Sequence, residues 1–431
     1  MWTRTWKSAL AGLTLAGMLA GCGSGNGEPA DPGDELRSDQ ARITDPQVPP
    51  ADLEALVAGD TEFALAAYRE LRATYTGNLF FSPHSISIAL AMTWAGARGA
   101  TADEMAAALS FELPQERLHP AFDLLDLELM SRAQAAESDE RPFVLRVVNQ
   151  LFGLRGYPFE AAFLDTLALY YGAGLRLMDF DLAPEACRLG INDWVAGQTH
   201  ERILDLIPAG CIDELTRLVL VNAIYFSAAW DSPFELEDTA PGPFTLLDGT
   251  ALEVPVMHQG LSAPGLQGDG FQAVELPYDG ELTSMVVIAP DAGTFADFEA
   301  GLSAESLDAI LASLTGKSVT LSMPRWTFTS QSLKLKELLA ALGMEVAFTS
   351  AADFNGMANT DELYIGEVIH KAFVAVDEAG TEAAAATAVI MEGGSAPEFL
   401  TVTLDRPFIY LIRDRETGAI LFLGRTLDPR G

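Results

Sequence analysis

Apolar residues recur at helical spacing through the first half of the chain, whereas the second half is dominated by short β-type runs. The helical pattern predicts helices over residues 53–71, 83–97, 101–109, 118–136, 160–170 and 185–199. Apolar runs of strand length predict strands over residues 144–154, 216–226, 271–276, 284–289, 318–323, 363–376, 408–412 and 420–423. Helices first and strands later indicate an α+β fold with large mixed sheets.

The domain organisation follows from where this pattern is interrupted. A chain of 431 residues is long enough for two or three domains of ordinary size. From residue 51 onwards, however, we find no second linker, no repeat and no low-complexity break. Residues 51–431 are therefore predicted to form one large domain.

The first 50 residues have a different composition. Arg4 and Lys7 precede an uncharged apolar stretch, and Leu19-Ala20-Gly21-Cys22 follows it. This arrangement is typical of a secretory signal over residues 1–21. Residues 19–22 resemble the lipobox of bacterial lipoproteins, in which the cysteine is lipidated. The alternatives are an ordinary signal peptide or a short membrane anchor. Residues 22–50 lack a periodic apolar pattern, which predicts a lipidated Cys22 followed by a flexible tether.

The lipobox resemblance implies an exported protein, held by its lipid at the bacterial cell envelope. Gly23, which follows the cysteine, is not acidic, and this favours the outer membrane or cell surface over the inner membrane. The lipid on Cys22 is the only membrane contact that we expect.

Composition narrows the range of functions. The formal charge is −35, and nucleic acid is not an expected partner, because phosphate binding needs clustered Lys and Arg. We find no hydrolase elbow, zinc-protease, phosphate-loop or Cys-x-x-Cys motif, and the five histidines are scattered singly. We therefore expect neither an enzyme nor a protein with a bound metal or cofactor.

One segment near the C-terminus stands out from ordinary loops. Residues 376–397 follow a strong strand and contain a glycine, a run of small residues, a short apolar stretch and Gly-Gly-Ser. A surface helix is one interpretation, because alanine favours helices. Long loops in compact domains are usually functional, and small alternating side chains also suit a segment that slides between two strands.

Together with several earlier stretches, this segment resembles the serpin family, and the resemblance extends from residue 51 to the end of the chain. The stretches that carry the resemblance, in order, are residues 78–86, 96–99, 101–105, 149–152, 192–195, 220–226 with Trp230, 370–372, 378–386 and 405–408. The resemblance implies three β-sheets, eight or nine helices and an exposed reactive-centre loop over residues 378–397. It implies a monomer that inhibits serine proteases, with cysteine proteases as a second class. The protease cuts the loop, and the loop then inserts into the main sheet as a new strand.

The resemblance also assigns roles to individual residues. The hinge of the loop comprises Glu378, Gly380, Thr381, Glu382, Ala383, Ala384, Ala385 and Ala386. Ser82, Ser85, Asn222 and His370 align with the shutter, a polar cluster beneath the opening sheet, and Trp230 aligns with the breach, where insertion starts. The family's loop length places the reactive bond at Gly394-Ser395, with Met391 and Glu392 as alternatives.

The loop sequence bears on the target protease. Residues 378–397 contain no Lys or Arg, which disfavours trypsin-like proteases and favours elastase-, chymotrypsin- or subtilisin-like ones. The hinge lacks the proline and bulky charged residues of many non-inhibitory serpins, although a non-inhibitory binding or chaperone-like module remains the alternative. The segment aligned with the heparin-binding helix, residues 116–137, is acidic, so heparin is not an expected partner. Cys187 and Cys211 are either a disulfide or two buried thiols.

Overall fold

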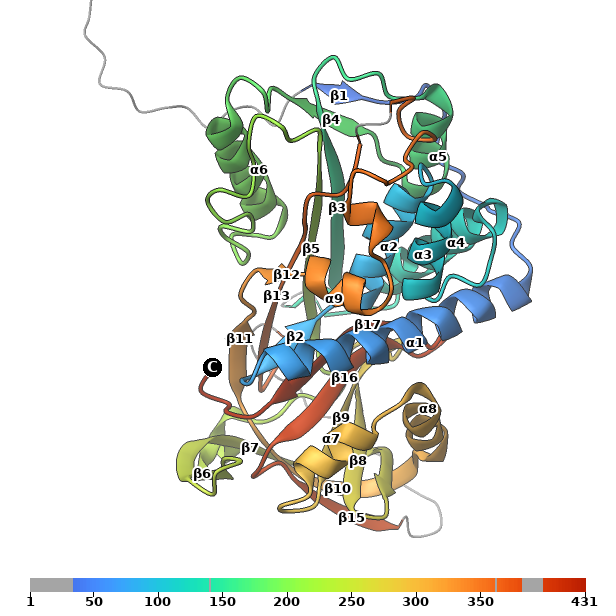
Figure 1. The fold of residues 1–431 in the computed structure, drawn as a ribbon. Coiled ribbons are helices and arrows are strands. Elements are labelled where there is room, and N and C mark those ends of the chain that lie inside the picture. The colour runs from blue at the N-terminus through green and yellow to red at the C-terminus, as the bar shows by residue number, and fades with distance from the viewer. Residues whose placement is uncertain (1–33, 139–140, 361–362, 382–397) are drawn as a thin grey trace, which may run out of the picture.

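The computed structural model describes residues 34–138, 141–360, 363–381 and 398–431. In these residues nine α-helices and two large mixed sheets form an elongated molecule, which confirms the predicted α+β fold (Figure 1). Most of the apolar core is one continuous cluster, and a smaller cluster lies beneath a single helix, α6 (Pro184–Gln198).

The first sheet, called the main sheet below, has the strand order β1-β4-β3-β5-β14-β13-β11, with β12 paired to β13. Its strands are β1 (Glu35–Leu36), β3 (Val144–Leu154), β4 (Leu175–Met178), β5 (Leu218–Ala229), β11 (Trp326–Thr329), β12 (Leu333–Lys334), β13 (Val368–Asp377) and β14 (Gly380–Thr381). Its two faces are buried differently, because side chains alternate along a strand. On β5, Ile224 and Phe226 belong to the large core, whereas Val221 and Ala223 belong to the cluster beneath α6.

The second sheet has the strand order β15-β10-β7-β8-β9-β16-β17-β2, with β6 paired to β7. Its strands are β2 (Leu79–Phe81), β6 (Ala240–Thr245), β7 (Ala251–Gln267), β8 (Phe271–Pro277), β9 (Thr283–Pro290), β10 (Thr315–Pro324), β15 (Phe399–Thr403), β16 (Phe408–Asp414) and β17 (Ile420–Thr426). The resemblance implied three sheets, whereas the hydrogen-bonded ladders of the described residues form two. The reason is β7, which pairs with β6 and β10 along most of its length and with β8 at its end.

The six helices predicted from the hydrophobic pattern are all present. They are α1 (Pro50–Thr74), α2 (Pro83–Trp94), α3 (Gly99–Ala108), α4 (Gln115–Ser131), α5 (Ala161–Tyr171) and α6. The pattern missed α7 (Phe295–Gly301), α8 (Ala304–Ser313) and α9 (Lys336–Ala341). α7 and α9 are too short to establish a period, whereas Ser303 caps α8 and was a usable signal. No helix in the described ranges is long and apolar enough to cross a membrane.

The strands were predicted less completely. The predicted strand over residues 363–376 begins only at Val368, because the chain before it is irregular and exposes Tyr364 and Gly366. The long β7 was missed altogether. It contains Pro255 and Pro264 and two glycines, and these residues argue against a strand when the sequence is considered alone.

Residues 34–49 differ from the predicted tether, and we call them the N-terminal strap. β1 adds a strand to the edge of the main sheet, where Leu36 pairs with Leu175 of β4. Further along, the Arg42 guanidinium donates to Asp123 at 2.8 Å and to Asp126 at 2.5 Å, both on α4. The backbone N–H of Ile43 donates to α5. Hydrogen bonds and ion pairs thus offset the weak apolar pattern, and for residues 34–50 the prediction of a free tether is wrong.

Candidate functional site

The two central strands of the main sheet diverge along their length, and the start of the hinge lies between them. β5 and β13 run parallel, and their ladder joins Leu220–Ile224 to Val368–Ala372. Further along both strands β14 takes the place of that ladder. Thr381 pairs antiparallel with Ala228 of β5 and with Val376 of β13. The hinge has therefore begun an additional strand of the main sheet.

Gly380 and Thr381 fit this position closely. A Cβ atom on Gly380 would lie 2.1 Å from the carbonyl oxygen of Ala228, so only glycine allows this approach to β5. The Thr381 side chain is buried, and its hydroxyl shares a hydrogen bond of 2.8 Å with the hydroxyl of Tyr278. Both residues were predicted as hinge residues, and the structure brings them together between β5 and β13.

The residues before β14 are fastened by a cluster that we call the hinge clamp. It comprises Arg141, Trp230, Arg325, Asp377 and Glu378. Arg141 donates to the Asp377 carboxylate at 3.1 Å, and Arg325 donates to Glu378 at 3.2 Å. The Trp230 indole N–H donates to the carbonyl of Asp377 at 3.0 Å. Burial raises the pKa of Asp377, and the nearby Arg141 opposes that rise. The predicted breach residue, Trp230, thus directly contacts the segment that leads into the hinge.

The four predicted shutter residues form one hydrogen-bonded chain beneath the β5–β13 ladder. Ser82 caps α2, where its hydroxyl accepts from the Ser85 N–H at 3.1 Å. The Asn222 amide donates to the Ser85 hydroxyl at 2.6 Å, and His370 is hydrogen bonded to the Asn222 carbonyl oxygen. Asn149 of β3 also accepts from the Asn222 amide, at 2.6 Å. The cluster therefore links both central strands to α2.

The geometry fixes the protonation state of His370. Its Nε2 accepts the backbone N–H of Ser82 at 3.1 Å, so Nδ1 carries the proton that is donated to Asn222. Burial lowers the pKa of His370 to about 3, because no carboxylate among the bonded partners compensates an imidazolium. His370 is therefore neutral in the folded protein and brings no charge to the shutter.

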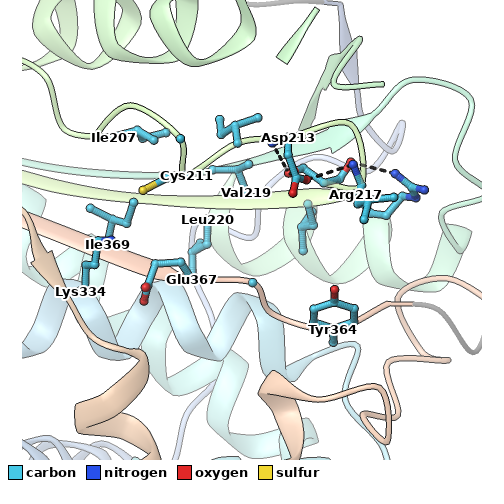
Figure 2. Close-up of a pocket in the computed structure, with 16 residues that line it drawn as sticks. Ile207, Cys211, Asp213, Arg217, Val219, Leu220, Lys334, Tyr364, Glu367 and Ile369 are labelled. Carbon is cyan, nitrogen blue, oxygen red and sulfur yellow. Dashed lines mark hydrogen bonds between the residues drawn. The ribbon is translucent and has the colours of Figure 1, made fainter. Parts of the chain in front are cut away.

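At the other end of the β5–β13 ladder lies a cavity of about 340 Å³ (Figure 2). Its walls come from β5, from the chain that enters β13, from the segment after α6, and from β12. Figure 2 shows Cys211 beside Ile369 and Lys334 at one end of this cavity and Arg217 at the other. The Arg217 guanidinium donates to the backbone carbonyls of Glu214 and Thr216.

The remaining predicted residues either lie outside the described ranges or are the two cysteines. Glu382, the run Ala383–Ala386, Met391, Glu392, Gly394, Ser395 and Cys22 lie outside the described residues. Cys187 and Cys211 are both free, Cys187 being buried and Cys211 half-buried, so the disulfide alternative is not formed in this structure. Within the part of the chain that the structure describes, no three His, Cys, Asp or Glu side chains gather as a metal site.

Sequence reasoning missed four residues that hold the hinge and the shutter. Tyr278, Arg141 and Arg325 come from segments far from the hinge in sequence, and a single sequence carries no signal for such contacts. Asn149 did have a signal, because it opens the motif Asn149-Gln-Leu-Phe152 that supported the family resemblance. In β3 it lies directly opposite Asn222.

Comparison with known proteins identifies the fold and the family. A family model described as serpin (serine protease inhibitor) matches residues 58–429. An uncharacterised serpin-like protein of Thermococcus kodakarensis is 41% identical over 372 residues, covering 85% of this chain and 84% of that protein. The leukocyte elastase inhibitor of Bos taurus is 39% identical over 387 residues, covering 88% of this chain and 100% of that protein.

Solved structures agree with this result. Human kallistatin is 29% identical, with a TM-score of 0.76 and coverage of 88% of this chain and 99% of that chain. Uncleaved ovalbumin is 25% identical, with a TM-score of 0.76 and coverage of 87% of this chain and 100% of that chain. The resemblance stated from sequence motifs is therefore confirmed.

Proposed function

Because this chain belongs to the serpin family, we propose that it inhibits serine proteases as a suicide substrate. The observation that carries the proposal is the position of β14. Thr381 pairs with both β5 and β13, so the first residues of the hinge already occupy the place of the strand that insertion completes.

The register of the sheet supports continued insertion. Along the β5–β13 ladder each residue of β5 faces the residue of β13 that is 148 positions later, as Leu220 faces Val368. The hinge preserves this offset, because Thr381 lies between Ala228 and Val376, which are also 148 positions apart. A strand that continues from Thr381 therefore matches both neighbours without a slip. It replaces the parallel β5–β13 ladder with two antiparallel ladders, which are slightly more stable per residue.

Continued in the same register, the inserted loop would pass over the shutter. In that strand Thr387, six residues after Thr381, would come opposite Asn222 on one side and His370 on the other. The side chain of Thr381 faces the core, so that of Thr387 would face the core as well. Its hydroxyl replaces the hydrogen bond between Asn222 and His370 that breaks when the strands separate. The small side chains of the hinge let the chain pass without enlarging the core.

In the proposed reaction the protease serine attacks the carbonyl carbon of Gly394. The Gly394–Ser395 bond breaks, the new amine at Ser395 takes a proton, and an ester links Gly394 to the protease. Insertion then carries the ester along the main sheet before water hydrolyses it. Elastase-, chymotrypsin- or subtilisin-like proteases are the proposed targets. The basis is the absence of Lys and Arg from residues 378–397 and the similarity to the leukocyte elastase inhibitor.

The test is to incubate the protein with elastase-, chymotrypsin-, subtilisin- and trypsin-like proteases. The proposal predicts a complex with one of the first three that survives SDS. Trypsin serves as the control that forms none. The non-inhibitory alternative would instead be established by two results together. Every protease would cut the loop without forming a complex, and the cut protein would melt no higher than the uncut one.

We further propose that the chain is exported and anchored at the bacterial envelope by a lipid on Cys22. The Leu19-Ala20-Gly21-Cys22 motif supports this proposal. The described chain begins at β1, and β15, which follows the loop, lies at the opposite end of the molecule (Figure 1). An anchor before β1 would leave β15, the strand that follows the loop, at the end of the molecule away from the membrane. Cys22→Ala is expected to release the protein from the membrane fraction, and retention in that fraction would refute the anchor.

A further inference from the structure

The strand that follows the loop, β15, and its neighbour β10 share an outward face that is open to solvent. Side chains alternate along a strand, so Leu400 and Val402 of β15 are buried in the core while the residues between them point outward. We call the outward residues of the two strands the β15–β10 face, and all of them are exposed or half-buried. It comprises Ser318, Thr320, Ser322, Phe399, Thr401 and Thr403.

This face is built almost entirely from short, uncharged side chains. Each outward residue of β10 is paired with one of β15, as Thr320 is paired with Thr401. β7 continues the face on the other side of β10, where Gly260 is paired with Thr320. Apart from Phe399, every side chain of the face is a serine or a threonine. A partner can therefore approach it closely without meeting a long or charged side chain of the face.

Phe399 is the exception in both size and polarity. Its side chain is 83% exposed, more than that of any other large apolar residue in the described ranges. The strand beneath it is held firmly, because Lys317 of β10 donates to the Glu398 carboxylate and the Ser318 N–H donates to the Glu398 carbonyl at 3.0 Å. An exposed aromatic ring on a fixed strand is typical of the residues that anchor a protein interface.

The place of Phe399 in the sequence indicates what covers it. The proposed reactive bond joins Gly394 to Ser395, and Phe399 follows Ser395 by four residues. Four residues span at most about 14 Å, even when the chain is fully extended. A protease domain of about 200 residues has a radius of gyration of about 16 Å. A protease that holds the reactive bond is thus close enough, and large enough, to contact Phe399 and the start of β15.

We propose that the β15–β10 face is a second contact surface for the target protease, and that Phe399 enters an apolar depression beside the active site of that protease. This inference rests on the proposed function, and it adds a property of the target. An aromatic anchor bordered by hydroxyl groups matches the apolar core and polar rim of protein interfaces. The contact forms when the two proteins meet, before the loop is cut. It therefore governs which protease is captured and how fast, and it leaves the later insertion unchanged.

Replacing Phe399 by threonine tests the anchor, because threonine suits an exposed position on a strand. With the protease that forms the SDS-stable complex, the second-order rate constant of inhibition should fall at least tenfold. The fraction of cut molecules that end in the complex should stay at the parental value, and so should the melting temperatures of the uncut and cut forms. Leu182→Thr is the matched control, because Leu182 is 81% exposed and precedes α6, at the other end of the molecule from β15 (Figure 1). It should inhibit at the parental rate.

A change on β10 tests whether the protease contacts the sheet as well as the loop. Thr320→Gln lengthens a side chain in the middle of the face without adding a charge, and it should slow inhibition at least threefold. Thr320 lies outside the chain that the protease cuts, so this effect cannot come from the loop sequence. Thr74→Gln, at the exposed end of α1, is the control and should have no effect.

The outcomes distinguish the two proposals. If the parent protein forms no complex with any protease, the proposed function fails. If the parent forms the complex and Phe399→Thr inhibits at the parental rate, the contact surface is refuted and the function stands. Slower inhibition by Phe399→Thr together with a lower melting temperature of its uncut form would also refute the surface, because Phe399 would then stabilise the fold.

Discussion

Replacing Thr381 by arginine should convert the inhibitor into a substrate. Thr381 is 1% exposed and shares a 2.8 Å hydrogen bond with Tyr278. Losing that hydrogen bond costs about 1 kcal/mol. A guanidinium left without a partner in the same buried position costs roughly 3–5 kcal/mol more. Since each 1.4 kcal/mol corresponds to a factor of ten, insertion becomes less favourable by about three orders of magnitude or more.

The assay follows the fate of the acyl-enzyme. Insertion competes with hydrolysis of the ester, so slower insertion diverts the reaction to released, active protease. We expect Thr381→Arg to be cut at the parental rate, to form no SDS-stable complex, and to gain no thermal stability after cutting. Thr381→Ser keeps the hydroxyl and should inhibit as the parent does. An arginine variant that forms complexes at the parental yield would refute insertion of this residue into the main sheet.

Three further predictions concern the strap, the hinge and pH. Arg42→Ala removes the partner of the fully buried Asp123 and should lower the free energy of unfolding in urea by about 3 kcal/mol. Arg37, which forms an exposed ion pair with Glu35, is the control, and Arg37→Ala should lower the free energy of unfolding by less than about 1 kcal/mol. Equal losses in the two variants would contradict the role of Arg42 in fastening the strap. Gly380→Ala should expel the hinge from the sheet, because its Cβ meets a β5 carbonyl at 2.1 Å, and faster amide exchange in β14 would report this. Exchange at the parental rate would show that the hinge tolerates the methyl group. Because the folded pKa of His370 is lowered to about 3, the unfolded chain binds its proton first as pH falls below about 6.5, and stability should decline by up to about 1.4 kcal/mol per pH unit. In His370→Asn the free energy of unfolding in urea should decline less steeply between pH 6.5 and 4 than in the parent protein. An identical slope in the two proteins would count against a neutral His370 in the shutter.

Elements with a strong local pattern were predictable from sequence. α2 is an example, because Ser82 and Pro83 mark its start and every residue after them is buried. The positions of Gly380 and Thr381 were also predictable, since small residues in a long loop next to a strong strand carry a recognisable pattern. Whether the hinge lies inside or outside the sheet was not, because that depends on backbone pairing with β5 and β13.

Contacts between distant segments account for what the sequence did not reveal. Tyr278 lies 103 residues from Thr381, and Arg141 lies 236 residues from Asp377. Nothing local marks either residue as part of the hinge region. The prediction of a free tether, where the structure has the strap, was wrong for a related reason. Its binding depends on Arg42 meeting two carboxylates of α4, and hydrophobic periodicity does not register ion pairs.

The central claim is that the loop continues β14 as a strand between β5 and β13, and a crystal structure of the protein cut at its reactive bond tests it most directly. The account predicts that Thr387 lies between Asn222 and His370 in the cut protein. A cut protein in which the ladder from Leu220 to Val368 remains intact would contradict it.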